Sequence, residues 1–260
     1  MEFIDFVLFL NSIPGLGIHG IKKIIYENRG MLGDLEFCKY LIEVNSGIHF
    51  NRLKVNVDRI KSLCDKLGVT IIRGENYPIY NSPLLLFTKG DRSLLEVEKI
   101  ISVAGTRNPS DLGIKIGEEI ISHIVKSKWV TISGLANGCD KLAHKTTIES
   151  GGVTIAVLPY GYRKDVAPWI LNNGLIISEY PPYSSQEKYK CIHRNRIIAG
   201  LSKLLYVIES NKDSGSEHTM KYATYMNIPI IYSLGFTEIC NYSNNKVITP
   251  IEFDLFTKNL

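Results

Sequence analysis

From Gly68 onward, the chain alternates short runs rich in β-branched residues with longer amphipathic stretches. The runs lie at residues 69–72, 84–87, 100–104, 129–133, 153–158, 175–178, 204–209 and 228–232. Because they are apolar along almost their whole length, they are typical of parallel strands that helices cover on both faces. The sequence therefore predicts an α/β fold with a doubly wound, mostly parallel sheet of about eight or nine strands.

The residues before this pattern are predicted to be helical. One helix face carries an apolar set at i, i+3, i+4, i+7 spacing, namely Phe3, Phe6, Val7 and Leu10. A second apolar set follows a Pro-Gly-Leu-Gly turn at 14–17, and further helices are predicted at about 34–44 and 57–67. We therefore divide the chain into a helical module at 1–65, a sheet domain at 66–235 and a C-terminal tail at 236–260 with no assigned role.

Composition restricts the kinds of function. Lys and Arg number 30 against 26 Asp and Glu, and the formal charge of +4 permits a polyanionic partner without indicating one. The five cysteines are scattered without a CxxC pair, so we expect reduced thiols and neither a zinc site nor a disulfide framework. The N-terminus lacks a basic leader, and no run approaches the ~18 apolar residues of a membrane span. We therefore expect a soluble, cytoplasmic protein with no membrane partner, no metal and no cofactor.

The first turn that carries chemistry follows the predicted strand at 100–104. It reads Gly105-Thr106-Arg107, with Ser110 shortly before a helical pattern. Ligands of a parallel sheet gather at the carboxyl ends of its strands. A glycine lets the backbone approach a ligand, hydroxyls and helix N-terminal amides donate hydrogen bonds, and an arginine adds a forked cation. This combination suits phosphate.

The turn after the strand at 129–133 combines small residues with an acid. Its candidate residues are Ser133, Gly134, Ala136, Gly138 and Asp140, with His144 one helical turn further on. Asp140 either takes part in the site by holding a neighbouring loop, or serves only as a helix cap. His144 either contacts a phosphate or base, or is a packed structural residue. The residues leave both choices open.

Two later turns and one helix add to the set. Gly161 lies in an aromatic turn at 160–163, where bases could stack on tyrosine, and Ser214-Gly215-Ser216 again offers hydroxyls and amides at a helix start. Arg194-Asn195-Arg196 places two cations before an apolar run. These cations are either ordinary surface charges or part of a continuous basic groove, and their position beside several phosphate turns favours the groove.

The order and spacing of these motifs resemble the DprA/Smf family of DNA-processing proteins. The most specific stretch is Arg-Asn-Arg-Ile-Ile-Ala-Gly-Leu-Ser at 194–202, and the resemblance covers roughly residues 66–235. It extends to the turn at 13–17, which looks like the family's N-terminal helical module. The resemblance implies an extended Rossmann-like fold with a small N-terminal domain of the SAM or helix-hairpin-helix kind.

The resemblance also implies a function and a pocket. Family members bind single-stranded DNA, protect incoming DNA during natural transformation, help to load the RecA recombinase and act as homodimers, with no established catalytic step. Carried onto this sequence, the pocket is formed or supported by Gly105, Thr106, Arg107, Ser133, Gly134, Arg194, Asn195, Arg196, Ser214, Gly215 and Ser216. Arg107 and Arg196 are the expected phosphate contacts, and Ser110, Ala136, Gly138, Asp140, His144 and Gly161 complete the candidate DNA-binding set.

Other functions remain open. The same sheet could sense a small nucleotide, or cleave a nucleoside monophosphate as a phosphoribohydrolase with Glu179, Glu209 or Glu217, although the Pro-Gly-Gly-x-Gly-Thr turn of such enzymes is missing. A dinucleotide-dependent oxidoreductase is disfavoured because no Gly-x-Gly-x-x-Gly follows the first strand. The N-terminal turn fits either a hairpin that contacts a DNA backbone or a plain αα-hairpin.

Overall fold

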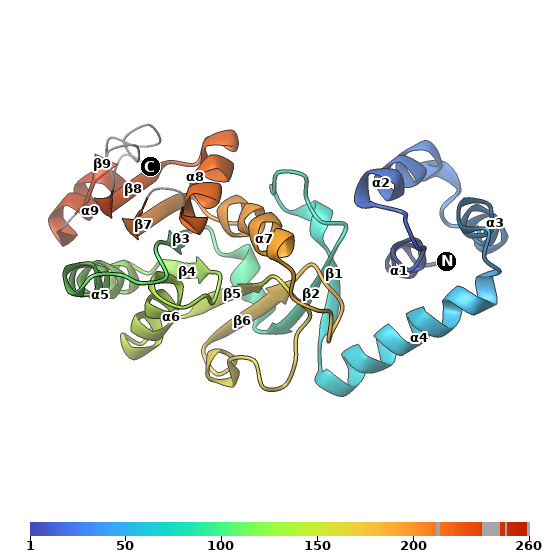
Figure 1. Ribbon diagram of the computed structural model, residues 1–260, viewed down its shortest axis with the longest axis horizontal. Coiled ribbons are helices and arrows are strands. Elements are labelled where there is room, and N and C mark those ends of the chain that lie inside the picture. The colour runs from blue at the N-terminus through green and yellow to red at the C-terminus, as the bar shows by residue number, and fades with distance from the viewer. Residues whose placement is uncertain (212–213, 236–244, 248, 259–260) are drawn as a thin grey trace. The chain divides into compact units, whose positions relative to one another are not determined.

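The structure is a computed structural model that describes residues 1–211, 214–235, 245–247 and 249–258 (Figure 1). The chain divides into two compact units, Met1–Arg73 and Gly74–Leu260. The boundary that we placed at 65/66 falls in the last turn of a helix, and the first unit continues beyond it to Arg73. Among the described helices, none combines the length and the apolar character needed to cross a bilayer.

The first unit is helical and ends in a short strand. Its elements are α1 (Phe3–Asn11), α2 (Ile18–Glu27), the 3-10 turn η1 (Arg29–Met31), α3 (Leu35–Ser46), α4 (Phe50–Leu67) and β1 (Thr70–Arg73). The helical prediction is confirmed, and Gly15 has the positive φ of 78° that the turn between α1 and α2 requires. The prediction started α4 too late, at about residue 57. Between residues 50 and 56 only Leu53 is buried, so this part of the helix shows no apolar periodicity.

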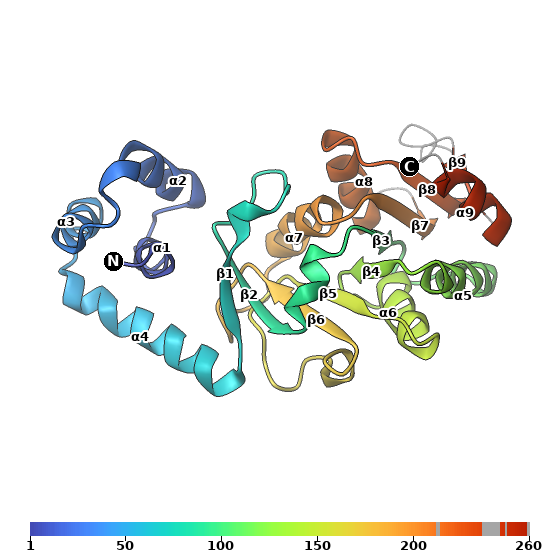
Figure 2. The ribbon, with the colours of Figure 1, turned by 180° about the vertical axis from the view of Figure 1, so that it is seen from behind.

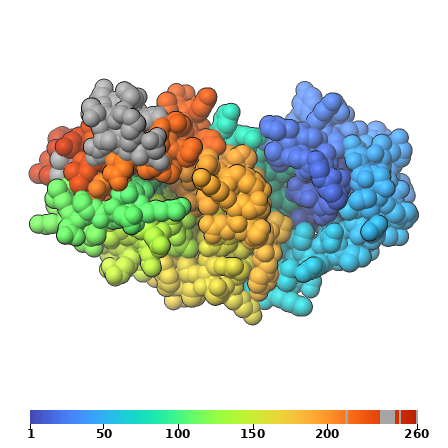
Figure 3. Space-filling model, viewed as in Figure 1, coloured from blue at the N-terminus to red at the C-terminus, as the bar shows by residue number. Residues whose placement is uncertain are grey.

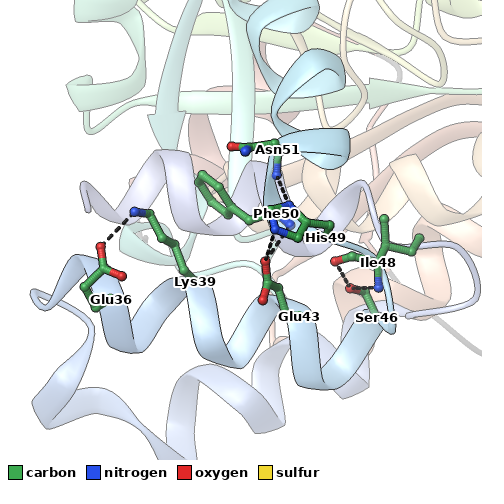
Figure 4. A network of polar contacts seen from close by, with 8 residues as sticks. All are labelled: Glu36, Lys39, Glu43, Ser46, Ile48, His49, Phe50 and Asn51. Atoms are coloured by element: carbon green, nitrogen blue, oxygen red, sulfur yellow. Dashed lines mark hydrogen bonds and ion pairs between the residues drawn. The ribbon is translucent and has the colours of Figure 1, made fainter.

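A polar network fixes the turn between α3 and α4 (Figure 4). Glu43 Oε1 accepts a hydrogen bond from the Phe50 amide at 2.8 Å and lies 3.8 Å from His49 Nε2. The Ser46 hydroxyl accepts from the Ile48 amide at 2.9 Å, and Gly47 ends α3 with a φ of 63°. The start of α4 is therefore held by side chains of α3.

The second unit is built on a twisted sheet. Its strands are β2 (Leu85–Gly90), β3 (Ile100–Ala104), β4 (Val130–Ser133), β5 (Thr154–Leu158), β6 (Gly174–Ser178), β7 (Leu204–Ser210), β8 (Ile230–Gly235) and β9 (Asn245–Lys246). They lie in the order β2-β6-β5-β4-β3-β7-β8-β9, and β2 runs antiparallel to β6 while the other neighbours are parallel. The predicted α/β fold with a mostly parallel sheet is confirmed.

Helices cover both faces of this sheet (Figure 1 and Figure 2). Along β7, Tyr206 and Ile208 pack with α5 (Asp111–Lys126) and α6 (Cys139–Glu149), whereas Leu205 and Val207 pack with α7 (Lys188–Gly200) and α8 (Gly215–Tyr225). Successive side chains of a strand point to opposite faces. A strand that is buried on both faces must therefore be apolar throughout, which explains the unbroken runs in the sequence.

The strand order changes direction beside β3. The chain lays down β3, β4, β5 and β6 toward one edge and then returns to place β7 on the free side of β3. The loops that leave β3 and β7 therefore diverge to opposite faces of the sheet. In open α/β sheets, the crevice between such diverging loops is where ligands bind.

The C-terminal segment contributes to the core. Helix α9 (Pro250–Thr257) starts with a capping box between Thr249 and Glu252, and its Phe253 is completely buried in the cluster that contains Trp129. Strand β9 pairs with β8. The tail that we set apart at 236–260 thus includes elements of the sheet domain, while residues 236–244 lie outside the described part of the chain.

Phe253→Ala is expected to destabilise the protein by about 3–5 kcal/mol, because truncating a buried phenylalanine leaves a cavity. Chemical denaturation followed by circular dichroism measures the change in free energy of unfolding. Ile251→Ala is the matched control on the same helix, since Ile251 is 72% exposed. Equal stability of the two variants would contradict the packing of α9.

Candidate functional site

A cavity of about 1100 Å³ opens in the second unit at the carboxyl ends of β3 and β7. It lies where the sheet order changes direction, between the loop after β3, the loop before α6, one side of α7 and the first turns of α8. Ten of the predicted site residues line it: Gly105, Thr106, Arg107, Ala136, Asp140, Arg194, Asn195, Ser214, Gly215 and Ser216. Seven do not: Ser110, Ser133, Gly134, Gly138, His144, Gly161 and Arg196.

The loop after β3 is fastened at both ends and leaves Arg107 exposed. The Thr106 amide donates to the Glu209 carbonyl at 2.8 Å. Glu209 Oε2 accepts from the Ser110 amide and hydroxyl, each at 2.9 Å, and Ser110 in turn caps α5 through the Gly113 amide at 3.1 Å. Ser110 is therefore an anchor of the loop, and Arg107 is its exposed cation.

Arg194 is buried and holds the neighbouring loops together. Its Nη1 donates to the carbonyl oxygens of Gly134, at 2.5 Å, and Val157, and its Nε donates to Asn195 Oδ1 at 3.1 Å. A Cβ atom on residue 134 would collide with this guanidinium. Gly134 is thus required because its missing side chain leaves space for Arg194. The bonds of Arg194 to both loops hold this wall of the cavity in place.

The turn before α6 is organised by Asp140 and Gly138. Asp140 Oδ2 accepts from the Ala136 amide at 3.3 Å, so this carboxylate binds the loop that precedes its own helix. Burial raises the pKa of Asp140, and the nearby Arg194 guanidinium acts in the opposite direction. Gly138 has a φ of 78° and would, with a Cβ, collide with the carbonyl oxygens of Thr106 and Arg107.

Arg196 does not face the cavity. It is 1% exposed and forms a two-pronged ion pair with Glu179, with Nη2 lying 2.7 and 2.8 Å from the two carboxylate oxygens. A phosphate could reach it only after this pair had been broken. The geometry therefore speaks against our expectation of a direct phosphate contact at Arg196.

Three serine hydroxyls meet at the start of α8. Ser210, Ser214 and Ser216 lie 2.6 to 2.9 Å from one another, and Ser214 does not cap the helix with its side chain. The side-chain Nδ2 of Asn195 donates to the Gly215 carbonyl at 3.3 Å and links this turn to α7. The helix start thus lies at the cavity with the hydroxyls of Ser214 and Ser216, and helix N-termini favour anions.

His144 and Gly161 have structural roles. His144 is completely buried, its Nδ1 lies 2.7 Å from the Thr154 hydroxyl, and its ring packs edge-on against Trp169. Burial, with a smaller contribution from Arg194, lowers the pKa of His144 from 6.5 to about 3, so the imidazole is neutral. A Cβ on Gly161 would collide with the Pro181 carbonyl, so this glycine permits the contact of two loops.

The sequence reasoning missed most of the cavity wall on α7. Lys188, Cys191, Ile192 and Ile198 line the cavity beside the predicted Asn195. Their spacing of i, i+3, i+4, i+7 and i+10 is that of one helix face, which the sequence could have revealed once the helix was known to begin at Lys188. Within the described ranges, no three His, Cys, Asp or Glu side chains gather as ligands for a metal ion.

Comparisons with known proteins agree on one family. The family model described as DNA recombination-mediator protein A matches residues 70–249. The DNA processing protein DprA of Bacillus subtilis is 34% identical over 157 residues, which cover 56% of this chain and 53% of that protein. The chain thus spans about half the length of the curated relatives that it matches.

Two solved structures share the fold. The structure of DNA processing protein A from Streptococcus pneumoniae aligns with a TM-score of 0.76 at 24% identity, over 98% of each chain. That of DNA processing protein A from Helicobacter pylori aligns with a TM-score of 0.62 at 22% identity, over 68% of this chain and 89% of the other. These likenesses confirm the predicted Rossmann-like architecture.

Gly134→Ala is expected to destabilise the protein by about 1–3 kcal/mol, because the added methyl group overpacks against a guanidinium that its carbonyl partners hold in place. Thermal and chemical unfolding measure the loss. Gly215→Ala serves as the control, since nothing lies within 4 Å of a Cβ at that cavity residue, and its stability should change by no more than about 0.5 kcal/mol. A tolerant Gly134→Ala variant would mean that Arg194 is not fixed as described.

His144 should make the protein less stable in acid. Its pKa of about 3 lies below the ordinary 6.5, so between these values the unfolded chain binds a proton that the folded chain excludes. Stability from this residue is therefore complete above pH 6.5 and is lost as the pH falls, by up to about 1.4 kcal/mol per pH unit. Urea unfolding of the wild type and of His144→Gln measures the free energy of unfolding at intervals of about one pH unit between pH 4 and 7. Parallel curves for the two proteins would refute the assignment.

Proposed function

The chain belongs to the DNA recombination-mediator protein A family, and we propose that it binds single-stranded DNA, without reading its sequence, in the cavity beside the carboxyl end of β3. The observation that carries this proposal is the composition of the cavity wall. It brings an exposed arginine, the first turn of a helix and the hydroxyls of Ser214 and Ser216 to one crevice. All of these groups donate hydrogen bonds to phosphate oxygens, which are identical along a strand.

Arg107 is the principal phosphate contact in this proposal. It is exposed, lines the cavity and has no carboxylate partner among the described residues, in contrast to Arg196. Lys188 adds a second exposed cation at the start of α7. The buried Arg194 contributes by holding the walls in position and not by touching the ligand.

The volume of the cavity is compatible with a strand and with a single nucleotide. Pockets for small molecules have volumes of about 300–1,000 Å³, and this cavity, at about 1100 Å³, lies near the top of that range. The H. pylori relative, whose fold this chain shares, is described for its single-stranded DNA binding mode. A module that senses a small nucleotide is therefore the second candidate.

We do not assign a catalytic step. The three glutamates that could have assisted a phosphoribohydrolase each have another partner: Glu179 pairs with Arg196, Glu209 holds Ser110 and Glu217 pairs with Lys221 at 2.9 Å. A carboxylate engaged in this way is poorly placed to act as a general acid or base on a ligand. By family resemblance, we extend the proposal to homodimers that deliver the bound strand to a RecA-type recombinase in natural transformation.

Arg107→Ala should weaken the binding of unrelated single strands about equally. Loss of one phosphate contact should also reduce the slope of log affinity against log salt by about 0.7. Fluorescence anisotropy with labelled oligo-dT across a salt series measures both, with duplex and mononucleotides as competitors. Stability should remain at the wild-type value, because the side chain is exposed.

Arg92→Ala is the matched control, as Arg92 is an exposed arginine of η3 (Arg92–Glu96) outside the cavity. Arg196→Ala should lower stability by about 3–5 kcal/mol, since it leaves Glu179 without its buried partner. An Arg107→Ala variant with unchanged affinity and salt slope would overturn the proposed site. Binding of mononucleotides but of no strand would favour the nucleotide sensor.

A further inference from the structure

A cluster of tyrosines lies at the far end of α8, outside the cavity. The rings of Tyr80 and Tyr225 are stacked with centroids 5.5 Å apart, and the ring of Tyr222 lies 6.1 Å from that of Tyr80. Tyr225 is 73% exposed and Tyr80 is 49% exposed. The cluster therefore presents flat aromatic surface to solvent, at a place that the phosphate contacts described above do not use.

The cluster and the cavity occupy the same face of one helix. Gly215 and His218 line the cavity at the start of α8. Tyr222 and Tyr225 follow His218 at i+4 and i+7, which are positions of one helix face. The 11 residues of α8 span about 16 Å, a distance that a few nucleotides of an extended strand can cover. Figure 3 shows α8 and α7 beside each other at the surface of this unit.

Helix α7 completes the connection. Its Asn195 and Ile198 line the cavity, and its last residue, Gly200, lies against the Ile79 backbone so closely that a Cβ would come within 2.8 Å of Ile79 Cα. The Tyr80 amide also lies 3.2 Å from the Met226 sulfur. The backbone at Tyr80 is thus held by contacts with the ends of the two helices that form the cavity wall.

We propose that Tyr80, Tyr222 and Tyr225 form a base-stacking subsite for the single strand whose phosphates occupy the cavity. This inference rests on the proposed function. Every nucleobase has a flat face that stacks on an aromatic ring, so such a subsite lengthens the binding track without introducing sequence preference. The occupant is a nucleobase and not a generic apolar partner, because the surface is made of ring faces and continues the phosphate-binding face of α8.

The test compares two oligo-dT strands, one of about four nucleotides and one of about twelve, within the range of site sizes of single-strand binding folds. Tyr225→Leu keeps apolar area but removes the ring, Tyr225→Phe keeps the ring, and Tyr40→Leu changes a tyrosine of the first unit that is 60% exposed. Tyr225→Leu should bind the long strand about 5- to 100-fold more weakly, with little change for the short strand. Tyr225→Phe and Tyr40→Leu should bind both strands as the wild type does.

Static light scattering of each variant accompanies the binding series. Wild-type affinity of Tyr225→Leu for the long strand would overturn the subsite while leaving the cavity intact. A changed molecular mass of Tyr225→Leu without a change in length dependence would also overturn it, since the cluster would then be an interface between copies. Failure of the wild type to bind either strand would refute the proposed function itself, and with it the inference.

Discussion

The cavity wall depends on one buried guanidinium. Arg194 reaches from α7 into the space that Gly134 leaves and donates to carbonyl oxygens of two different strand ends, after β4 and at β5. Burying a cation is costly unless its hydrogen bonds are made and an opposite charge is near. Backbone carbonyls supply the first requirement and Asp140 the second. The same contacts that satisfy Arg194 fix the distance between α7 and the loop before α6, and so set the width of the site.

Much of the fold could be predicted because burial on both faces leaves a mark on the sequence. The eight apolar runs each became a strand within a few residues. For β3 to β7, the reason is that a central parallel strand has no solvent-facing side on which polar residues are accepted. The prediction was wrong or incomplete for elements with few buried apolar residues. The first turns of α4 bury Leu53 alone, and β9 has two exposed residues, so neither gave a period to recognise.

The sequence was enough to locate the candidate site, but it did not show which residue has which role there. Glycine turns after the strands marked the correct edge of the sheet, because a parallel topology places all of them together. Which arginine meets the ligand depends on helix phase and on where a helix begins. Arg194 and Arg196 were placed at a helix start, yet α7 begins at Lys188 and carries them in its buried middle. Only the structure shows that Arg196 meets Glu179, which lies 17 residues earlier in the chain.

The serine group at α8 has a consequence for how a strand would be held. A hydroxyl both donates and accepts, and its hydrogen turns freely about the C–O bond. Without a ligand, the hydroxyls of Ser210, Ser214 and Ser216 form hydrogen bonds with one another. In the proposed site, these hydroxyls can turn their hydrogens toward a phosphate oxygen. Because the phosphates of a strand are identical, a strand bound there would meet the same donors after moving by one phosphate.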